Sequence, residues 1–353
     1  MIKLIQLEGQ VFESCYSDIN AVMRQFKRYL LLALFLLNTG RLCAQQTVQF
    51  SQYVFNGLAV NPAYAGYREE WTGSLSYRMQ WAGITGAPRT AVASFDGVTN
   101  QESKRVGLGF IAMNDRLGAQ STSSFYGNYA YRLQIDDEEE RRLTFGIAFG
   151  VTQYGIDGTK LTAVDPNDVS VPTGNESKVY PDFRVGVYYS DPRFYIGASV
   201  LDMFSANRDQ ITTDDNYKIL KQVRHLYLTG GVVLPLSDVL DLKPTFMIKE
   251  DFNGPTNLDL NSYLLINKTL WIGASYRTGV SLWEKSNLQK GLDKSSAIAG
   301  IVELFVSDRF RVGYSFDYSI NALANYQQGS HEISLSLTLP RRDMRTSSNP
   351  RYF

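Results

Sequence analysis

The sequence predicts an all-β protein, a single up-and-down antiparallel outer-membrane β-barrel of about 14 strands with a non-strand N-terminal segment. Three observations predict this class. From residue 71 onward, segments of about ten residues alternate apolar side chains with small or polar ones. The connections between these segments alternate between short polar ones and others that include long loops. An export signal precedes all of the segments.

The N-terminal region has the order of a secretory leader. Three basic residues follow Met23, and an apolar run then extends from residue 29 to residue 37. This order is typical of a signal peptide, and the small Ala44 marks the expected cleavage site. Residues 1–44 are therefore expected to be an upstream extension and a signal peptide that are removed.

Cysteine usage fits export. The chain has two cysteines, Cys15 and Cys43, and both lie in the part that is expected to be removed. The mature chain is therefore expected to hold no disulfide, no thiolate metal site and no cysteine nucleophile. A lipid anchor on Cys43 is the alternative, although Leu42 directly before it does not match the usual order of a lipoprotein signal.

Composition excludes several classes of protein. Lys plus Arg and Asp plus Glu are balanced at 35 each, so the chain lacks the basic excess of a nucleic-acid binder. The chain is 44% hydrophobic with 22 Tyr and 19 Phe, yet no internal run reaches the roughly 20 apolar residues of a membrane-spanning helix. An exported, tyrosine-rich chain of this kind fits an outer-membrane barrel better than a disulfide-stapled secreted domain.

The alternation is clearest in the last two segments. One face of residues 309–320 is expected to carry only apolar side chains, which are Phe310, Val312, Tyr314, Phe316 and Tyr318. Residues 330–340 repeat the pattern with isoleucine and leucine on one face and polar residues on the other. A soluble β-sandwich would show the same alternation, so the connections are needed to decide between the two classes.

The connections favour a barrel. Those after even-numbered segments are mostly short and polar, whereas those after odd-numbered segments include long ones, such as residues 157–178 and 205–221. Outer-membrane barrels have short periplasmic turns and long external loops. Both termini are therefore expected in the periplasm, with residues 45–70 as a plug-like periplasmic segment, residues 71–340 as the barrel and residues 341–353 as a C-terminal tail. The expected strands are residues 71–80, 88–98, 105–116, 122–135, 141–156, 179–190, 193–204, 222–236, 240–252, 257–267, 270–279, 296–307, 309–320 and 330–340.

Candidate catalytic residues are few. The chain has two histidines, His225 and His331, so a metal motif with two histidines would need both. Glu332 follows His331, but no second histidine stands where zinc proteases have one. A structural histidine at a strand start is the favoured interpretation of His331, and a Ser-His pair for lipid hydrolysis is the alternative.

One loop resembles the start of a calcium-binding loop, because it carries Asp165, Asn167 and Asp168. The glycine and the final glutamate of that pattern are missing, so a solvated acidic loop is favoured. The sequence therefore predicts no enzyme activity, no cofactor and no metal site.

Four short motifs near the N-terminus carry a family resemblance. They are FSQY at residues 50–53, NPAYAG at 61–66, YRMQW at 77–81 and GAP at 86–88. Together with further motifs that continue in order to the terminal NPRYF, they show that the chain resembles the PorP/SprF family of type IX secretion system membrane proteins. The resemblance covers essentially the whole mature chain. The sequence departs from the family at Gly57, where proline is more frequent.

The resemblance implies a non-enzymatic outer-membrane barrel of the Bacteroidetes secretion and gliding motility machinery. Such a protein would support the export or surface anchoring of adhesins that carry a C-terminal sorting domain, or tether the machinery to a periplasmic secretion-system lipoprotein. An outer-membrane diffusion channel or small-molecule transporter is the alternative function. The barrel would be surrounded by outer-membrane lipid, and no nucleic-acid partner is expected.

The stretch FNGLAVNPAYAGY, residues 55–67, follows neither the helical nor the strand period. We expect residues 50–67 to form a non-strand segment inside the periplasmic mouth of the barrel, where protein covers irregular backbone. The segment would plug the pore or present a docking surface to a partner, and simple packing that closes the barrel is the alternative. The residues expected to carry this role are Phe50, Tyr53, Phe55, Asn61, Pro62, Tyr64, Gly66 and Tyr67.

Overall fold

The computed structural model describes residues 49–136, 140–162, 171–205, 210–212, 218–220, 223–252, 254–283, 285 and 295–339. The chain divides into two units, Met1–Cys43 and Ala44–Phe353, and the described residues all belong to the second. The expected signal peptide, the calcium-like loop and the C-terminal tail lie outside the described residues.

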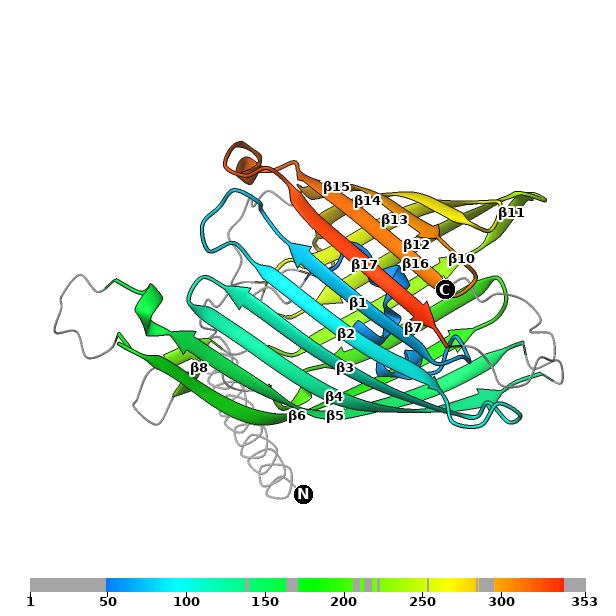
Figure 1. Ribbon diagram of the computed structural model, residues 1–353, viewed down its shortest axis with the longest axis horizontal. Coiled ribbons are helices and arrows are strands. Elements are labelled where there is room, and N and C mark those ends of the chain that lie inside the picture. Colours follow the sequence, from blue (N-terminus) through cyan, green and yellow to red (C-terminus); the bar gives the residue numbers. More distant parts are fainter. Residues whose placement is uncertain are drawn as a thin grey trace, which may run out of the picture. The chain divides into compact units, whose positions relative to one another are not determined.

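Antiparallel pairing joins fourteen strands into a closed barrel (Figure 1). The strands follow one another around the ring in chain order, and the ring closes where the first strand pairs with the last. This is the up-and-down connectivity that the sequence predicted. The barrel strands are β1 (Thr72–Met79), β2 (Arg89–Val98), β3 (Val106–Leu117), β4 (Gln120–Gln134), β5 (Arg142–Asp157), β6 (Asn175–Ser190), β7 (Phe194–Leu201), β10 (His225–Val232), β12 (Leu240–Glu250), β13 (Thr256–Ile266), β14 (Leu270–Val280), β15 (Ser295–Phe305), β16 (Phe310–Ser319) and β17 (Ser330–Thr338).

The predicted strand over residues 222–236 is interrupted in the structure. Strand β10 ends at Val232, and the short strand β11 (Leu234–Ser237) continues the pairing with β12. Pro235 lacks a backbone N–H for the ladder, and the register of β11 shifts between Pro235 and Ser237. Two further strands, β8 (Gln210–Thr212) and β9 (Lys218–Leu220), pair with each other within the connection from β7 to β10.

The outside of the barrel is apolar, and many of the inward-facing side chains are polar or charged. In β16 the aromatic rings of Tyr314, Phe316 and Tyr318 are exposed on the outside, whereas Ser315 and Asp317 between them are buried. The same alternation recurs in β17. The structure thus confirms the predicted faces, and an apolar exterior is what a barrel in lipid requires.

The two ends of the barrel differ in their connections. One end, which we call the short-turn end, carries the connections after β2, β4, β6, β11, β13 and β15. The other, the long-loop end, carries those after β1, β3, β5, β7, β12, β14 and β16. The turn between β3 and β4 is an exception at this end because it has only two residues, and Gly118 takes the positive φ of 60° that such a turn requires.

The helices of the described chain are all short 3-10 helices. Three of them precede β1, and their blue coils lie inside the ring of strands (Figure 1). Among the described residues, no helix has the length and apolar character needed to cross a membrane. The helices are η1 (Tyr53–Phe55), η2 (Gly57–Ala59), η3 (Pro62–Tyr64), η4 (Gly158–Lys160), η5 (Met203–Ser205) and η6 (Ala322–Asn325).

Candidate functional site

The interior of the barrel is occupied by the chain that leads into β1. We call this stretch, residues 49–71, the lumen segment. It supplies much of the hydrophobic core, packed against inward-facing side chains of the strands. All eight residues that the sequence singled out are buried in it: Phe50, Tyr53, Phe55, Asn61, Pro62, Tyr64, Gly66 and Tyr67.

Local sequence explains the irregular shape of the lumen segment. Asn61 begins η3, where its side-chain oxygen accepts a hydrogen bond of 2.9 Å from the backbone N–H of Ala63. Pro62 occupies the first helical position, where no N–H is needed. Gly66 has a φ of 72°, which redirects the chain after the helix. The segment is therefore a chain of capped turns rather than a strand.

The lumen segment runs from one end of the barrel to the other. At its start, Ser51 contacts β16 and β17 near their long-loop ends. At its finish, Glu69 contacts residues at the short-turn end, including Lys104 in the connection from β2 to β3. Sequence analysis placed the segment at one mouth of the barrel, whereas the described residues extend along the whole lumen.

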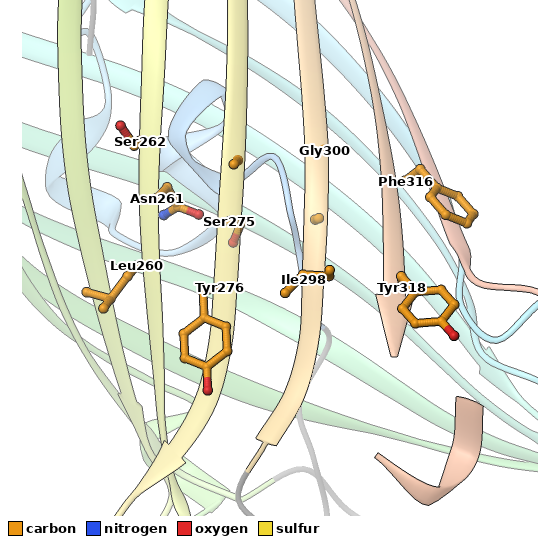
Figure 2. A pocket seen from close by; sticks show the side chains of 11 residues that line it. Leu260, Asn261, Ser262, Ser275, Tyr276, Ile298, Gly300, Phe316 and Tyr318 are labelled. Atoms are coloured by element: carbon orange, nitrogen blue, oxygen red, sulfur yellow. The ribbon is translucent and has the colours of Figure 1, made fainter. Parts of the chain in front are cut away.

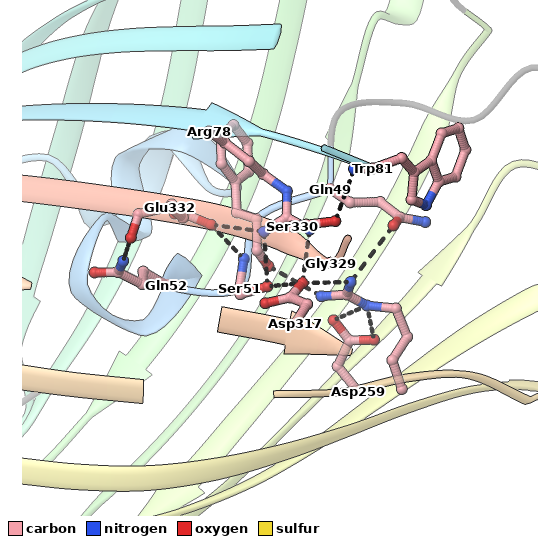
Figure 3. A network of polar contacts seen from close by, with 12 residues as sticks. Gln49, Ser51, Gln52, Arg78, Trp81, Asp259, Asp317, Gly329, Ser330 and Glu332 are labelled. Carbon is pink, nitrogen blue, oxygen red and sulfur yellow. Dashed lines mark hydrogen bonds and ion pairs between the residues drawn. The ribbon is translucent and has the colours of Figure 1, made fainter. Parts of the chain in front are cut away.

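The first anchor of the lumen segment is Ser51 (Figure 3). Its hydroxyl donates a hydrogen bond of 2.6 Å to Asp317, and its backbone N–H donates one of 2.8 Å to Glu332. Arg78 bridges the two carboxylates, at 2.6 Å from Asp317 and 3.2 Å from Glu332. All four residues are buried, and buried charges are stable only with such partners. The network therefore fixes the start of the segment.

Arg277 of β14, two strands from β16 in the ring, extends this network along the wall. Its Nε lies 2.9 Å from a carboxylate oxygen of Asp259, and a terminal nitrogen lies 3.6 Å from Asp317. The same guanidinium donates to the carbonyl of Phe50 and to the side chain of Gln49, each over 3.4 Å. The backbone of the lumen segment is thus a direct partner of a buried arginine.

The middle of the lumen segment lies against a wall that lacks side chains. A Cβ atom at Gly146 would lie 2.1 Å from the backbone nitrogen of Ala63, and one at Gly186 would lie 2.0 Å from Oδ1 of Asn61. Real Cβ atoms do not approach other atoms so closely, so only glycine fits these positions. We call this set of wall residues the glycine track; it comprises Gly107, Gly146, Gly186 and Gly197.

Aromatic side chains fill the space around the track. Tyr64 and Tyr67 stack with their ring centres 5.0 Å apart, and both meet the ring of Tyr188 edge-on. On the other side of the lumen, Nδ2 of Asn261 donates a hydrogen bond of 2.7 Å to the hydroxyl of Tyr53.

The second anchor of the lumen segment is Glu69. Its carboxylate lies 2.9 Å from Lys104, 3.4 Å from Arg142 and 3.7 Å from Arg132. Glu69 itself has a φ of 64°, a conformation that residues with side chains rarely adopt. Strained backbone of this kind persists only where its surroundings hold it, and here three cations do so.

The candidate histidines are not brought together. His225 is buried in β10, and its Nδ1 lies 2.6 Å from the carbonyl of Val223. His331 of β17 lies beside the outward-facing Tyr314, with 2.8 Å between Nδ1 and the hydroxyl. Within the described part of the chain, no group of three His, Cys, Asp or Glu side chains is arranged to hold a metal ion.

The outer surface of the barrel has a shallow depression of about 610 Å³ (Figure 2). At its floor lie Ser262, Ala274 and Gly300, which are direct neighbours across β13, β14 and β15. Larger side chains, including Leu260 and Tyr276, project around them. The depression opens on the apolar exterior of the barrel.

Sequence analysis missed the partners of the lumen segment. The alternation within residues 309–320 puts Asp317 on the face opposite the apolar one, but nothing in the sequence links it to Ser51, 266 residues away. Gly146 and Gly186 were likewise visible only as glycines within strands. Their position inside the strands β5 and β6 was the available signal, since a glycine in a strand often marks the close approach of another backbone.

One family model matches most of this chain. Residues 42–337 match the model of a family described as Type IX secretion system membrane protein PorP/SprF. No curated protein sequence matches the chain significantly.

Several solved barrels are similar to this chain at low sequence identity. The CymD monoaromatic hydrocarbon channel has a TM-score of 0.49 at 12% identity, over 82% of this chain and 94% of that chain. Omp33 of Acinetobacter baumannii has a TM-score of 0.43 at 9% identity, over 77% of this chain and 100% of that chain. A FadL homologue of Pseudomonas aeruginosa has a TM-score of 0.44 at 9% identity, over 81% of this chain and 92% of that chain.

Proposed function

Since residues 42–337 match that family model, the chain belongs to the PorP/SprF family of type IX secretion system membrane proteins, and we propose that it acts as a non-enzymatic scaffold of that system. In this role the barrel supports the export or surface anchoring of adhesins with a C-terminal sorting domain, or tethers the machinery to a periplasmic lipoprotein. The barrel itself is an integral outer-membrane component.

The observation that carries the proposal is the filled lumen. The lumen segment passes through the barrel from the long-loop end to the short-turn end, and buried charges anchor it at both ends. A lumen filled in this way supports a closed barrel rather than an open path for a solute. The barrel therefore suits a structural role, in which its two faces hold partners, better than a role as an open conduit.

The proposal includes an orientation. Short turns face the periplasm in outer-membrane barrels, so the short-turn end, with the C-terminal end of β17, is assigned to the periplasm. Gln49 contacts β14 near its long-loop end. This contact supports an external position for the start of the lumen segment, as an alternative to the expectation that both termini are periplasmic.

Affinity purification tests the proposal. A tagged copy is purified from its own outer membrane in mild detergent, and mass spectrometry identifies the proteins that remain bound. Recovery of a secretion-system lipoprotein, or of an adhesin through its C-terminal domain, is the expected result. Recovery of the barrel alone would contradict the scaffold.

Conductance measurements test the closed lumen directly. The purified barrel is expected to give no steady conductance in a planar bilayer, whereas a variant that lacks residues 50–66 is expected to conduct. Steady conductance or solute uptake by the unmodified barrel would favour the alternative function, a diffusion channel or small-molecule transporter.

A further inference from the structure

Two neighbouring loops at the long-loop end form one continuous surface, which we call the neutral rim. It consists of residues 80–88, between β1 and β2, and residues 320–329, between β16 and β17. Backbone hydrogen bonds join the two loops. The N–H of Ala82 donates to the carbonyl of Gly329 over 2.8 Å, and the N–H of Gln328 donates to the carbonyl of Ala82 over 2.7 Å.

The backbone holds the rim in a fixed shape. Trp81 has a φ of 50°, a rare conformation for a bulky residue, and its N–H donates a hydrogen bond of 3.0 Å to the hydroxyl of Ser330. The far side of the rim is fastened to the turn between β3 and β4, where the N–H of Gly118 donates to the carbonyl of Gly86 over 2.8 Å. A surface that is already ordered loses little conformational entropy when it binds.

The rim carries no charge. Neither loop contains Asp, Glu, Lys, Arg or His, although 20% of the chain is charged. Every other connection of more than two residues between successive barrel strands contains at least one charged residue. Tyr326 is 75% exposed, which makes it the most exposed of the large hydrophobic side chains in the described part of the chain. The other side chains of the two loops include amides and aromatic or aliphatic groups, among them Gln80, Trp81, Ile84, Asn325 and Gln328.

We propose that the neutral rim is a docking surface for a secretion-system protein whose contacting surface is also uncharged, an inference that rests on the proposed scaffold function. Tyrosine, tryptophan and amide side chains are the groups that protein interfaces use most effectively. Phosphate groups of a lipid or an acidic protein would need arginine or lysine partners, and the rim has none. Burial of an unpaired charge is costly, so a neutral partner surface is the complementary one.

Photo-crosslinking tests the inference. Tyr326 is replaced by p-benzoyl-phenylalanine in the full-length chain, intact cells are irradiated, and the adducts are identified by mass spectrometry. The expected result is an adduct with a type IX secretion protein. Its yield should be the same in about 0.05 M and about 0.5 M NaCl, because salt does not screen an uncharged contact. Addition of charges through Thr85→Asp and Gln328→Asp should lower the yield at least about tenfold.

A matched control uses the same crosslinker at Phe204, which is 57% exposed in the charged connection from β7 to β10. No adduct with that protein is expected there. Three outcomes would overturn the docking surface. They are the absence of a protein adduct at Tyr326, an adduct with a saccharide, and an adduct that is lost in high salt. If a secretion partner still copurifies with the barrel in those cases, the scaffold function stands. If no partner copurifies, both proposals are wrong.

Discussion

Ser51 in the lumen segment and Asp317 in β16 are joined by a hydrogen bond of 2.6 Å, although 266 residues separate them in the sequence. Arg78 of β1 and Arg277 of β14 share the same carboxylate, at 2.6 Å and 3.6 Å. One acidic side chain thus connects the segment inside the barrel with strands on both sides of the point where the first and last strands pair.

Replacement of Asp317 by asparagine is expected to release the start of the lumen segment. Removal of one partner from a buried ion pair costs about 3–5 kcal/mol, and a value near the lower end is expected because Arg78 keeps Glu332 and Arg277 keeps Asp259. Urea unfolding of the detergent-solubilised barrel should show a loss of stability of that size. Asp308→Asn, at an exposed position of the short turn between β15 and β16, is the matched control and should change the stability by less than about 0.5 kcal/mol. Equal effects of the two variants would show that the network does not hold the segment.

Alanine at Gly146 is expected to push the lumen segment off the wall. Its Cβ would lie 2.1 Å from the backbone nitrogen of Ala63, and overpacking of this kind costs about 1–3 kcal/mol or more. The segment of the folded variant should be cut faster by a protease and should block conductance less completely. Gly300→Ala is the matched control, because a Cβ there meets no atom within 4 Å. Unchanged proteolysis in Gly146→Ala would mean that the close contact with the track is not needed.

The strands and the lumen segment differ in how much of their structure could be predicted from the sequence. The alternation in β16 and β17 identified which apolar side chains share a face, because the strand period alone decides this. The aperiodic stretch around Asn61 was recognised as ordered non-strand chain for the converse reason. Its path through the lumen was not predictable, since it depends on which strands supply Gly146 and Asp317, and such pairings across the barrel leave no local pattern. The break between β10 and β11 at Val233 was predictable in part, because Pro235 disfavours a regular strand but was included in the single strand predicted over residues 222–236.

Glu69→Gln is expected to loosen the other end of the lumen segment. Glutamine keeps the size of the side chain but removes the negative charge that lies within 4 Å of Lys104, Arg132 and Arg142. We expect a loss of stability of about 3–5 kcal/mol in urea unfolding. Glu102→Gln is the control, since Glu102 lies exposed in the same turn as Lys104. The prediction fails if the two glutamine variants unfold at the same urea concentration.

The path of the lumen segment predicts the face of the membrane from which a reagent can reach its first residues. Gln49 is partly exposed and lies near the long-loop end of β14, so a cysteine at this position should react with a membrane-impermeant maleimide from the same face as a cysteine at Tyr326. Ser307→Cys, in a short turn, should react from the opposite face. The three variants are made in a chain whose Cys15 and Cys43 are replaced by serine, so that each has a single thiol. Labelling of intact cells and of lysed cells then separates the two faces. If Gln49→Cys reacts together with Ser307→Cys, the segment does not pass through the barrel in the direction that its contacts with Asp317 and Glu69 require.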